Sequence, residues 1–408
     1  MSGSEEASIP WLGVQEKASA ESGRRLAFLE PLVSKIRGGR LKIVLPNGRA
    51  LISPAHSDGL QATFAIERWR ALRRLALGGD VGFAEAYVDG DWTSPDLVAL
   101  LRLAARNVEP LRAAMRGAAF FRWAGRLRHF MRANTRRGSR RNIAAHYDLG
   151  NDFFALWLDA TMQYSSALWT EDTPDLEAAQ AFKLHRIVDL LDLNGAESVL
   201  EIGCGWGALA TYLAQSGNAR VTAITVSPAQ LAFARARTPS IGRFDFRLQD
   251  YRDVSGRFDR IVSVEMLEAV GEARWPQYFQ TIAQSLKAGG RGVLQTITID
   301  EAYYESYRRN PDFIQKHVFP GGFLPSKSAL AAQIERAGLR ILDRSSFGPS
   351  YARTLAEWRK RFHSRWPEAA ALGFDDRFRR LWDYYLAYCE AGFAEGTIDV
   401  TLVSIAHG

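Results

Sequence analysis

The stretch that most limits the possible folds is residues 198–207, SVLEIGCGWG. Its apolar start leads directly into three glycines, Gly203, Gly205 and Gly207, and helix-forming residues follow from Ala208. Glycines at this spacing permit a sharp strand-to-helix turn and let a ligand approach the backbone closely. The spacing differs from the G-x-G-x-x-G of dinucleotide-binding turns, and no Lys-Ser or Lys-Thr pair follows, so a phosphate loop is excluded. We therefore expect an α/β sheet with a ligand site at the carboxyl end of its first strand.

Strands and helices alternate from residue 198 almost to the end of the chain. This alternation is typical of a doubly wound α/β domain, which we expect over residues 142–408. Its later strands are predicted at residues 220–226, 244–248, 258–265, 293–297 and, as a last and antiparallel strand, 398–405.

A smaller α+β domain is predicted over residues 23–107, after a polar and loose segment at residues 1–22. Ser94 or Asp96 is available to cap its third helix. Glycine pairs favour helix ends after residues 37 and 77. The predicted elements are helices at residues 26–37, 62–77 and 96–106 and a strand at residues 41–45.

Positive charge is concentrated in one segment. The 408 residues carry a net charge of +7, yet ten arginines and no acidic residue lie between Leu111 and Arg141. Without that segment, 42 basic residues stand against 45 acidic ones. Its apolar residues recur at helical spacing, so a basic amphipathic linker helix is predicted over residues 108–141. The pattern argues against a protein that coats nucleic acid and favours local contact with an anionic partner, although a solvated basic face fits it equally well.

The chain lacks the features of secreted, membrane-spanning and metal-binding proteins. Its apolar runs fall short of the roughly 18 residues that a membrane-spanning helix needs, and its acidic, polar start does not resemble a secretory signal. Its two cysteines, Cys204 and Cys389, cannot build a disulfide framework. No His, Asp or Glu group has metal-ligand spacing, so no metal site is predicted. We expect a cytoplasmic protein.

The acid-then-glycine pattern E-x-G-x-G-x-G resembles motif I of the S-adenosylmethionine-dependent methyltransferases. This resemblance implies a seven-stranded, Rossmann-like sheet. It also implies that Gln249 and Asp250, which follow the third strand, lie where the adenine amino group is held. The residues expected to bind S-adenosylmethionine are Tyr164, Ser165, Glu201, Gly203, Gly205, Gly207, Thr225, Gln230, Gln249, Asp250 and Glu265.

Motifs outside the glycine turn narrow the resemblance. They occur in the order HYDLGNDFF (146–154), MQYSS (162–166), LQDYR (248–252), FPGGFLPS (319–326) and FGPSY (347–351). Together they resemble the cyclopropane-fatty-acyl-phospholipid synthase family, which includes mycolic acid methyltransferases. The resemblance covers about residues 140–408 and, more weakly, residues 82–92 of the small domain. It implies methylation of a double bond in an acyl chain through a carbocation, and it suggests a homodimer formed through the small domain.

The family resemblance also implies a catalytic group. Its members use bicarbonate as a base, held by a Glu, a Tyr, a His, a Cys and a backbone amide. Glu268, Tyr351 and the backbone of Ile297 match this pattern, but Ser166 replaces the Cys and Gln295 the His. Ser166 and Gln295 can still donate hydrogen bonds to an anion, whereas a Gln amide, unlike His, cannot take up a proton or a positive charge at neutral pH. We therefore hypothesise a methyl-branched, unsaturated product, with a cyclopropane as the alternative.

These observations predict a C-methyltransferase for unsaturated acyl chains of membrane phospholipids, bound peripherally to an anionic membrane surface through the arginine-rich segment. The alternative substrate is an acyl chain on an acyl carrier protein, or a small molecule, because an acidic carrier would also suit the arginines. The intact glycine turn argues against a non-catalytic binding module. The lack of a recognition motif argues against nucleic-acid binding.

Overall fold

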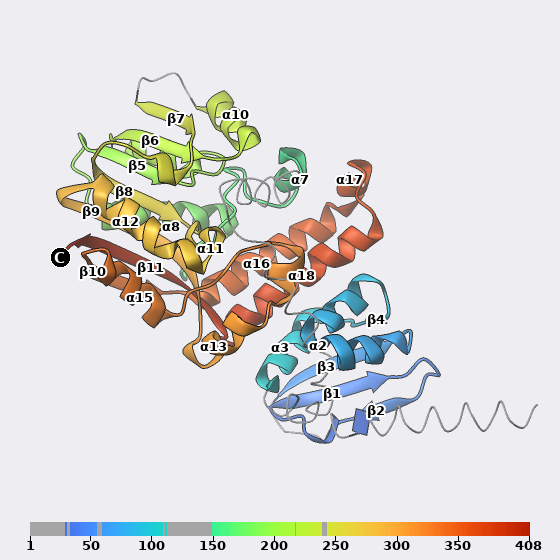
Figure 1. Ribbon diagram of the computed structural model, residues 1–408. Helices are drawn as coiled ribbons and strands as arrows, with labels where there is room; N and C mark the ends of the chain where they lie inside the picture. Colours follow the sequence, from blue (N-terminus) through green and yellow to red (C-terminus); the bar gives the residue numbers. More distant parts are fainter. Residues whose placement is uncertain are drawn as a thin grey trace, which may run out of the picture.

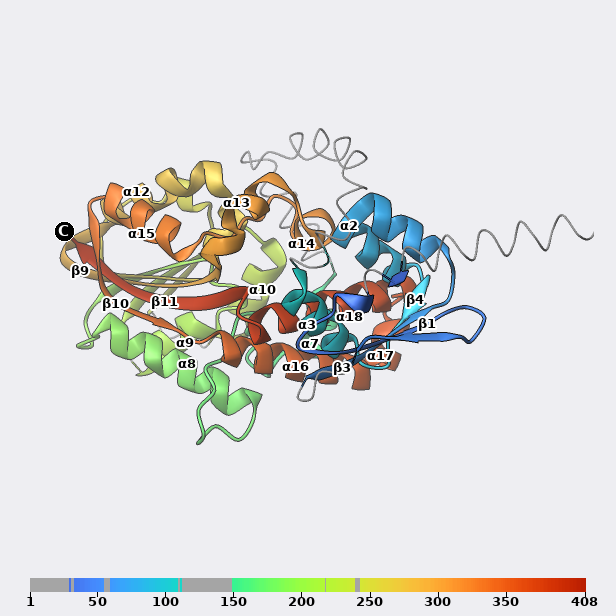
Figure 2. The same ribbon diagram turned by 90° about the horizontal axis from the view of Figure 1, so that it is seen from below.

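The computed structural model describes residues 29–30, 33–54, 59–108, 111, 149–216, 218–238 and 243–408. Figures 1 and 2 show a large sheet at one end of the molecule and a small sheet at the other, with the long helices α16 (Gly348–Ser364) and α18 (Asp376–Ala394) between them. The predicted segment 1–22 and nearly all of the predicted linker helix at 108–141 lie outside the described residues.

The large sheet has seven strands in the order β10-β11-β9-β8-β5-β6-β7. Strand β11 pairs antiparallel with both of its neighbours, and the other pairs are parallel. The doubly wound sheet and its last, antiparallel strand are thereby confirmed. The strands are β5 (Ser198–Ile202), β6 (Arg220–Thr225), β7 (Phe244–Leu248), β8 (Phe258–Val264), β9 (Leu286–Ile299), β10 (Leu339–Ser346) and β11 (Ile398–His407).

Helices cover both faces of this sheet. Val199 packs in a core with residues of α8 (Leu176–Leu191) and α9 (Ala208–Ser216). Its neighbour Leu200 packs in another core with residues of α12 (Trp275–Ser285) and α15 (Lys327–Arg336). Successive side chains of a strand point to opposite faces, so one strand serves both cores. The remaining helices of this part are α7 (Asn151–Ala155), α10 (Pro228–Arg237), α11 (Leu267–Val270), α13 (Glu301–Arg309), α14 (Phe313–His317) and α17 (Trp366–Ala371).

The small sheet has the strand order β2-β1-β3-β4 and is accompanied by helices α2 and α3. Residues 29–30 and 33–34, within the helix predicted at 26–37, are also helical. The predicted helix at 62–77 is wrong in its first part, where the chain forms a strand. Ala62, Phe64 and Ile66 are buried in alternation, which is the two-residue period of a strand. Asp96 caps the last helix, as expected, by accepting the backbone N–H of Ala99 at 2.9 Å. The elements are β1 (Gly39–Val44), β2 (Ala50–Ile52), β3 (Leu60–Ile66), α2 (Arg70–Val88), β4 (Trp92–Thr93) and α3 (Leu97–Arg106).

Polar contacts attach the small domain to the rest of the chain. The Tyr87 hydroxyl donates to Asp383 of α18 at 2.6 Å. Glu395, which follows α18, pairs with Arg102 and Arg106 of α3 at 2.7 Å each. The apolar core of the small domain also continues into α16 and α18. The small domain and the rest of the chain therefore pack against each other and can share the wall of one cavity.

The described ranges contain neither a membrane-spanning helix nor a metal-binding cluster. No helix there is long and apolar enough to cross a membrane, and no three side chains of His, Cys, Asp or Glu converge as a metal site would need.

Candidate active site

The glycine turn joins β5 to α9, where the strand order of the large sheet reverses. Gly203, Gly205 and Gly207 have φ angles of 83°, 51° and 88°. A Cβ would lie 2.7 Å from Met266 Cγ at Gly203 and 2.9 Å from Ala234 Cβ at Gly207. Side chains are therefore excluded by both backbone conformation and space. Because open α/β sheets bind ligands at such a reversal, the turn marks the ligand site.

The residues expected to bind S-adenosylmethionine line one cavity beside this turn. Glu201 is 3% exposed, and its Oε2 atom has no partner among the described residues. Burial raises the pKa of Glu201 to about 8. An unpartnered buried oxygen calls for a polar ligand atom, so the site fits the polar groups of S-adenosylmethionine. Gly207 shapes the turn without lining the cavity, and the expected residues that do line it are Tyr164, Ser165, Glu201, Gly203, Gly205, Thr225, Gln230, Gln249, Asp250 and Glu265.

Hydrogen bonds fix the side chains at the ends of β6 and β7. Asp250 accepts two bonds from the Arg252 guanidinium, at 2.8 and 2.6 Å. The Thr225 hydroxyl donates to Gln230 Oε1 at 2.9 Å. This part of the cavity is therefore held in place before any ligand binds.

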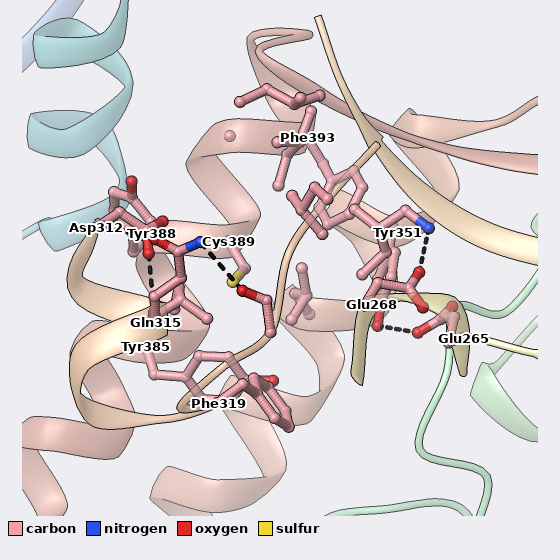
Figure 3. Close-up of a pocket in the computed structure, with 18 of the residues that line it drawn as sticks. Glu265, Glu268, Asp312, Gln315, Phe319, Tyr351, Tyr385, Tyr388, Cys389 and Phe393 are labelled. Carbon is pink, nitrogen blue, oxygen red and sulfur yellow. Dashed lines mark hydrogen bonds between the residues drawn. The ribbon is translucent and has the colours of Figure 1, made fainter. Parts of the chain in front are cut away.

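The cavity is large, with a volume of about 1110 Å³. From the glycine turn it passes the end of β8 and continues between α13, α14 and α18. It then reaches the apolar interior of the small domain at Ile43, Phe64 and Leu101. Figure 3 shows part of it, with Glu265 and Glu268 on one side and Asp312 on the other. A long and mostly apolar space of this kind suits a chain-like substrate.

Three donors hold the carboxylate of Glu265, at the end of β8. Its Oε2 accepts the hydroxyl of Tyr351 at 2.7 Å. Its Oε1 accepts the backbone N–H of Ser166 and Nε2 of Gln295, both at 2.8 Å. Burial raises the pKa of Glu265, and these hydrogen bonds and the charge of Lys183 oppose the rise.

The backbone of Glu265 is in the left-handed region, with φ of 50°. This conformation costs a non-glycine residue about 1–3 kcal/mol and tends to occur at functional sites. It accompanies a turn that aims the side chain at Tyr351, while the Glu265 N–H still bonds to the Gln295 carbonyl at 2.7 Å.

The donors that bind Glu265 are ones that the family resemblance assigns to bicarbonate. Tyr351, Ser166 and Gln295 are already engaged with the protein's own carboxylate. Ser166 contributes its backbone N–H, whereas its hydroxyl donates to the Ala167 carbonyl at 2.8 Å. The residues present therefore do not fit a separate bicarbonate ion at this position.

Glu268 is a second buried carboxyl group in the same wall. Its Oε1 accepts the Thr296 hydroxyl at 2.9 Å and the backbone N–H of Ile297. Its Oε2 has no partner among the described residues. Burial and, next, the charge of Glu265 raise the pKa of Glu268 to about 8. Glu268 therefore holds a proton at neutral pH, whereas the three donors around Glu265 favour its charged form against the effect of burial.

Aromatic rings make up much of the remaining wall. The ring of Tyr351 stacks on Phe393 with centroids 4.4 Å apart. The hydroxyls of Tyr164 and Tyr385 are 2.7 Å apart. All four residues line the cavity. Faces of such rings attract positive charge, so the wall suits a cationic intermediate.

Lys183 lines the cavity, and the sequence analysis missed it. It is 2% exposed, and its Nζ donates to the Ser165 hydroxyl at 2.8 Å. Burial lowers its pKa to about 8, so it stays mainly charged at neutral pH. Its charge acts on both Glu201 and Glu265. The sequence does contain a sign of this role. Lys183 lies on the same buried face of α8 as Leu176 and Ile187, and a lysine on an apolar helix face is unusual.

Comparisons with known proteins identify the class and the family of the chain. The model of the mycolic acid cyclopropane synthetase family matches residues 134–403. The tuberculostearic acid methyltransferase UfaA1 of Mycobacterium tuberculosis is 41% identical over 383 residues, which cover 88% of this chain and 86% of that protein. The cyclopropane-fatty-acyl-phospholipid synthase of Escherichia coli is 36% identical over 346 residues, covering 82% and 85%.

A solved structure gives the same result. The mycolic acid cyclopropane synthase CmaA1, complexed with SAH and CTAB, is 29% identical with a TM-score of 0.61. The match covers 65% of this chain and 97% of that one. Fold and glycine turn thus define an S-adenosylmethionine-dependent methyltransferase. Within that class, the chain belongs to the mycolic acid cyclopropane synthetase family, as its motifs predicted.

Proposed function

We propose that this enzyme methylates the double bond of an unsaturated acyl chain in a membrane phospholipid and releases a methyl-branched, unsaturated chain. The observation that carries the proposal is the Glu265 carboxylate, held by Tyr351, Ser166 and Gln295 in the wall of a long apolar cavity. It gives the enzyme a built-in base where the family resemblance implies a bound ion.

The chain's own residues hold both substrates. S-adenosylmethionine, when bound, supplies a methyl group made electrophilic by its positively charged sulfur. The glycine turn would open the backbone to it, Glu201 Oε2 would accept one of its polar hydrogens, and Gln249 and Asp250 would hold its adenine. The apolar cavity holds the acyl chain and excludes water, which a weak nucleophile and a reactive cation both require.

The proposed reaction needs only one base, because a single proton is lost for each methyl group added. The π electrons of the double bond form the bond to the methyl carbon as the carbon–sulfur bond breaks, and the adjacent carbon becomes a cation. A hydride shift moves the charge to the methyl-bearing carbon. Glu265 then removes one proton from the new methyl group or the neighbouring carbon, which leaves a double bond. Tyr351 and Phe393 present ring faces that stabilise the cation.

Ring closure would need the proton to leave the methyl group before the hydride moves. Gln295 cannot take up or release a proton at neutral pH, so the proton relay that the family resemblance implies is interrupted at this position. The names of the relatives support the same choice. The Mycobacterium tuberculosis relative, at 41% identity, is called a methyltransferase, and the Escherichia coli relative, at 36%, a cyclopropane synthase.

Access to phospholipid requires contact with a bilayer. We propose that the arginine-rich segment docks this enzyme on the anionic cytoplasmic surface, since each arginine near such a surface contributes about 1 kcal/mol. Sedimentation with liposomes at low and high salt tests this. Binding should need anionic lipid and weaken when Arg116, Arg122 and Arg126 become Gln. Binding that ignores both changes contradicts the docking.

The test of the function uses methyl-labelled S-adenosylmethionine and vesicles of anionic dimyristoyl phosphatidylglycerol that carry dioleoyl or distearoyl phosphatidylethanolamine. Label should enter only the unsaturated lipid. Glu265→Gln should lower turnover at least about 100-fold while calorimetry still shows cofactor binding, because Gln preserves the shape but cannot accept the proton. Transfer to a small molecule or carrier-bound chain, with none to vesicles, contradicts the proposal.

A further inference from the structure

A second polar group lies in the same cavity, away from the residues of methyl transfer. Figure 3 shows Asp312 and Tyr388 on the opposite side from Glu265. Tyr384 of α18 and Asp80 of α2 line the cavity with them. Three elements distant in sequence thus bring two carboxyl groups and two tyrosines to one end of an otherwise apolar space.

Asp80 marks where this end of the cavity meets solvent. Helix α2 is interrupted at Gly79, which has φ of 59° and ψ of −138°. Asp80 follows directly, and it is exposed although it also lines the cavity. A residue that belongs to both surfaces lies at an opening, so the mouth of the cavity is beside Asp80.

Asp312 lies further inside. It caps α14 by accepting the backbone N–H of Gln315 at 2.9 Å, and Figure 3 shows Tyr388 beside it. Burial, with the charge of Asp80 as a smaller contribution, raises the pKa of Asp312 to about 6. Asp312 is therefore mainly charged at neutral pH, and a cation would relieve the cost of keeping it so.

Tyr384 gives an independent sign of a ligand. It is 2% exposed, and its hydroxyl makes no hydrogen bond to any residue that the structure describes. Asp80 and Asp312 line the same cavity, and their charges, next to burial, raise the pKa of Tyr384. A buried hydroxyl without a protein partner is expected to find one in a ligand.

We propose that this mouth binds the ammonium group of an amine-bearing phospholipid headgroup while the acyl chain extends inward to Glu265. The inference rests on the proposed function and adds the headgroup class. A primary ammonium has three N–H donors for the oxygens of Asp80, Asp312 and Tyr384, and tyrosine faces attract its charge. Both lipids carry a phosphate that the carboxylates repel, but a glycerol headgroup offers no cation to offset this repulsion. The mouth also leaves the headgroup beside solvent, which limits its desolvation.

The experiment compares two substrates on one surface. Vesicles of dimyristoyl phosphatidylglycerol, which has no double bond, carry a small fraction of dioleoyl phosphatidylethanolamine or dioleoyl phosphatidylglycerol, so that docking is equal. The natural chain should prefer the ethanolamine lipid about tenfold in kcat/KM, the size expected for hydrogen bonds to charged groups. Asp80→Asn and Asp312→Asn should each reduce the preference to about twofold or less. Asp375→Asn, at the cap of α18, is the control and should keep it.

Equal rates on both lipids in the natural chain, or a preference that survives both substitutions, would overturn the proposal. Asn still caps helices, so Asp312→Asn should fold, and calorimetry with S-adenosylmethionine checks this. If neither lipid is methylated, the proposed function is contradicted, and binding of short-chain phospholipids then tests the headgroup site at the cavity mouth on its own. Soluble dihexanoyl phosphatidylethanolamine should bind, its phosphatidylglycerol counterpart should bind at least about tenfold more weakly, and Asp312→Asn should abolish the difference. Equal binding contradicts the site.

Discussion

The hydroxyl of Tyr351 donates a hydrogen bond of 2.7 Å to Oε2 of Glu265, across 86 residues of sequence. It joins α16 to the end of β8 at the cavity wall. With the donors Ser166 and Gln295 it holds both oxygens of the carboxylate group and favours its charged form. A fixed, charged carboxylate in an apolar space is what proton removal from a short-lived cation requires.

Removal of this hydroxyl tests its role. Tyr351→Phe should lower kcat about 10- to 100-fold, because Glu265 loses a charge-assisted hydrogen bond and its alignment. Cofactor affinity should change little. Tyr278→Phe is the control, since that buried hydroxyl donates to Ser263 at 2.8 Å in another core. It should lower the unfolding free energy by about 1 kcal/mol and leave kcat near its starting value. Equal loss of kcat in both variants would count against the alignment.

When the Glu265 carboxylate is removed by substitution, a small anion should restore part of the activity. Glu265→Gly relieves the left-handed backbone and leaves Tyr351, Ser166 and Gln295 without an acceptor. Added formate or bicarbonate should restore part of the lost turnover, rising with concentration and saturating. Glu265→Gln fills the same space and should not be rescued. Rescue of both variants, or of neither, argues against a base at this position.

The charge of Lys183 should set the strength of the base. Lys183 lowers the pKa of Glu265 against the effect of burial, so Lys183→Met should raise that pKa further. The acid limb of the pH profile of kcat/KM should then move to higher pH, because Glu265 must be charged to act. Lys287→Met removes a partly exposed lysine paired with Asp259 and should leave the limb in place. An unmoved limb in Lys183→Met would refute the coupling.

Glu268 should make stability depend on pH. Its pKa is raised to about 8 in the folded chain, so its contribution is present below the unfolded value and is lost as pH rises toward 8. Glu268→Gln keeps the acceptor for Thr296 and Ile297 and removes this loss. Between pH 5 and 8, the unfolding free energy of the variant, relative to that of the natural chain, should increase with pH by up to about 1.4 kcal/mol per pH unit. Denaturant titrations at several pH values measure it. A constant difference contradicts the assignment of the proton to Glu268.

Local patterns were sufficient for much of the fold. The glycine turn, the sheet built on it and the Asp96 cap follow from short-range rules, and all three are confirmed. The helix predicted at 62–77 failed because its first part alternates with a two-residue period, and strand β1 supplies the pairing partner. The glycines after residue 77 interrupt α2 rather than end it, since packing carries the helix on to Val88.

The site was predicted only as a set of residues. The motifs named Tyr351, Ser166 and Gln295 as catalytic residues and Glu265 as a cofactor-binding residue, but their mutual contacts depend on a left-handed residue that no local pattern indicates. The sequence therefore suggested an external ion where the chain supplies its own carboxylate. Lys183 escaped notice because its meaning appears only when the buried carboxyl groups around it are in place.

Product analysis tests the central claim most directly. The purified enzyme is incubated with S-adenosylmethionine carrying a carbon-13 methyl group and vesicles of dimyristoyl phosphatidylglycerol that carry dioleoyl phosphatidylethanolamine, and the released acyl chains are examined by mass spectrometry and NMR. The label should appear in a branch on a chain that is still unsaturated, either as a methyl group beside the double bond or as an exocyclic methylene carbon. Label found mainly in the high-field resonances of a cyclopropane ring would contradict the role of Glu265 as the base that leaves a double bond in the product.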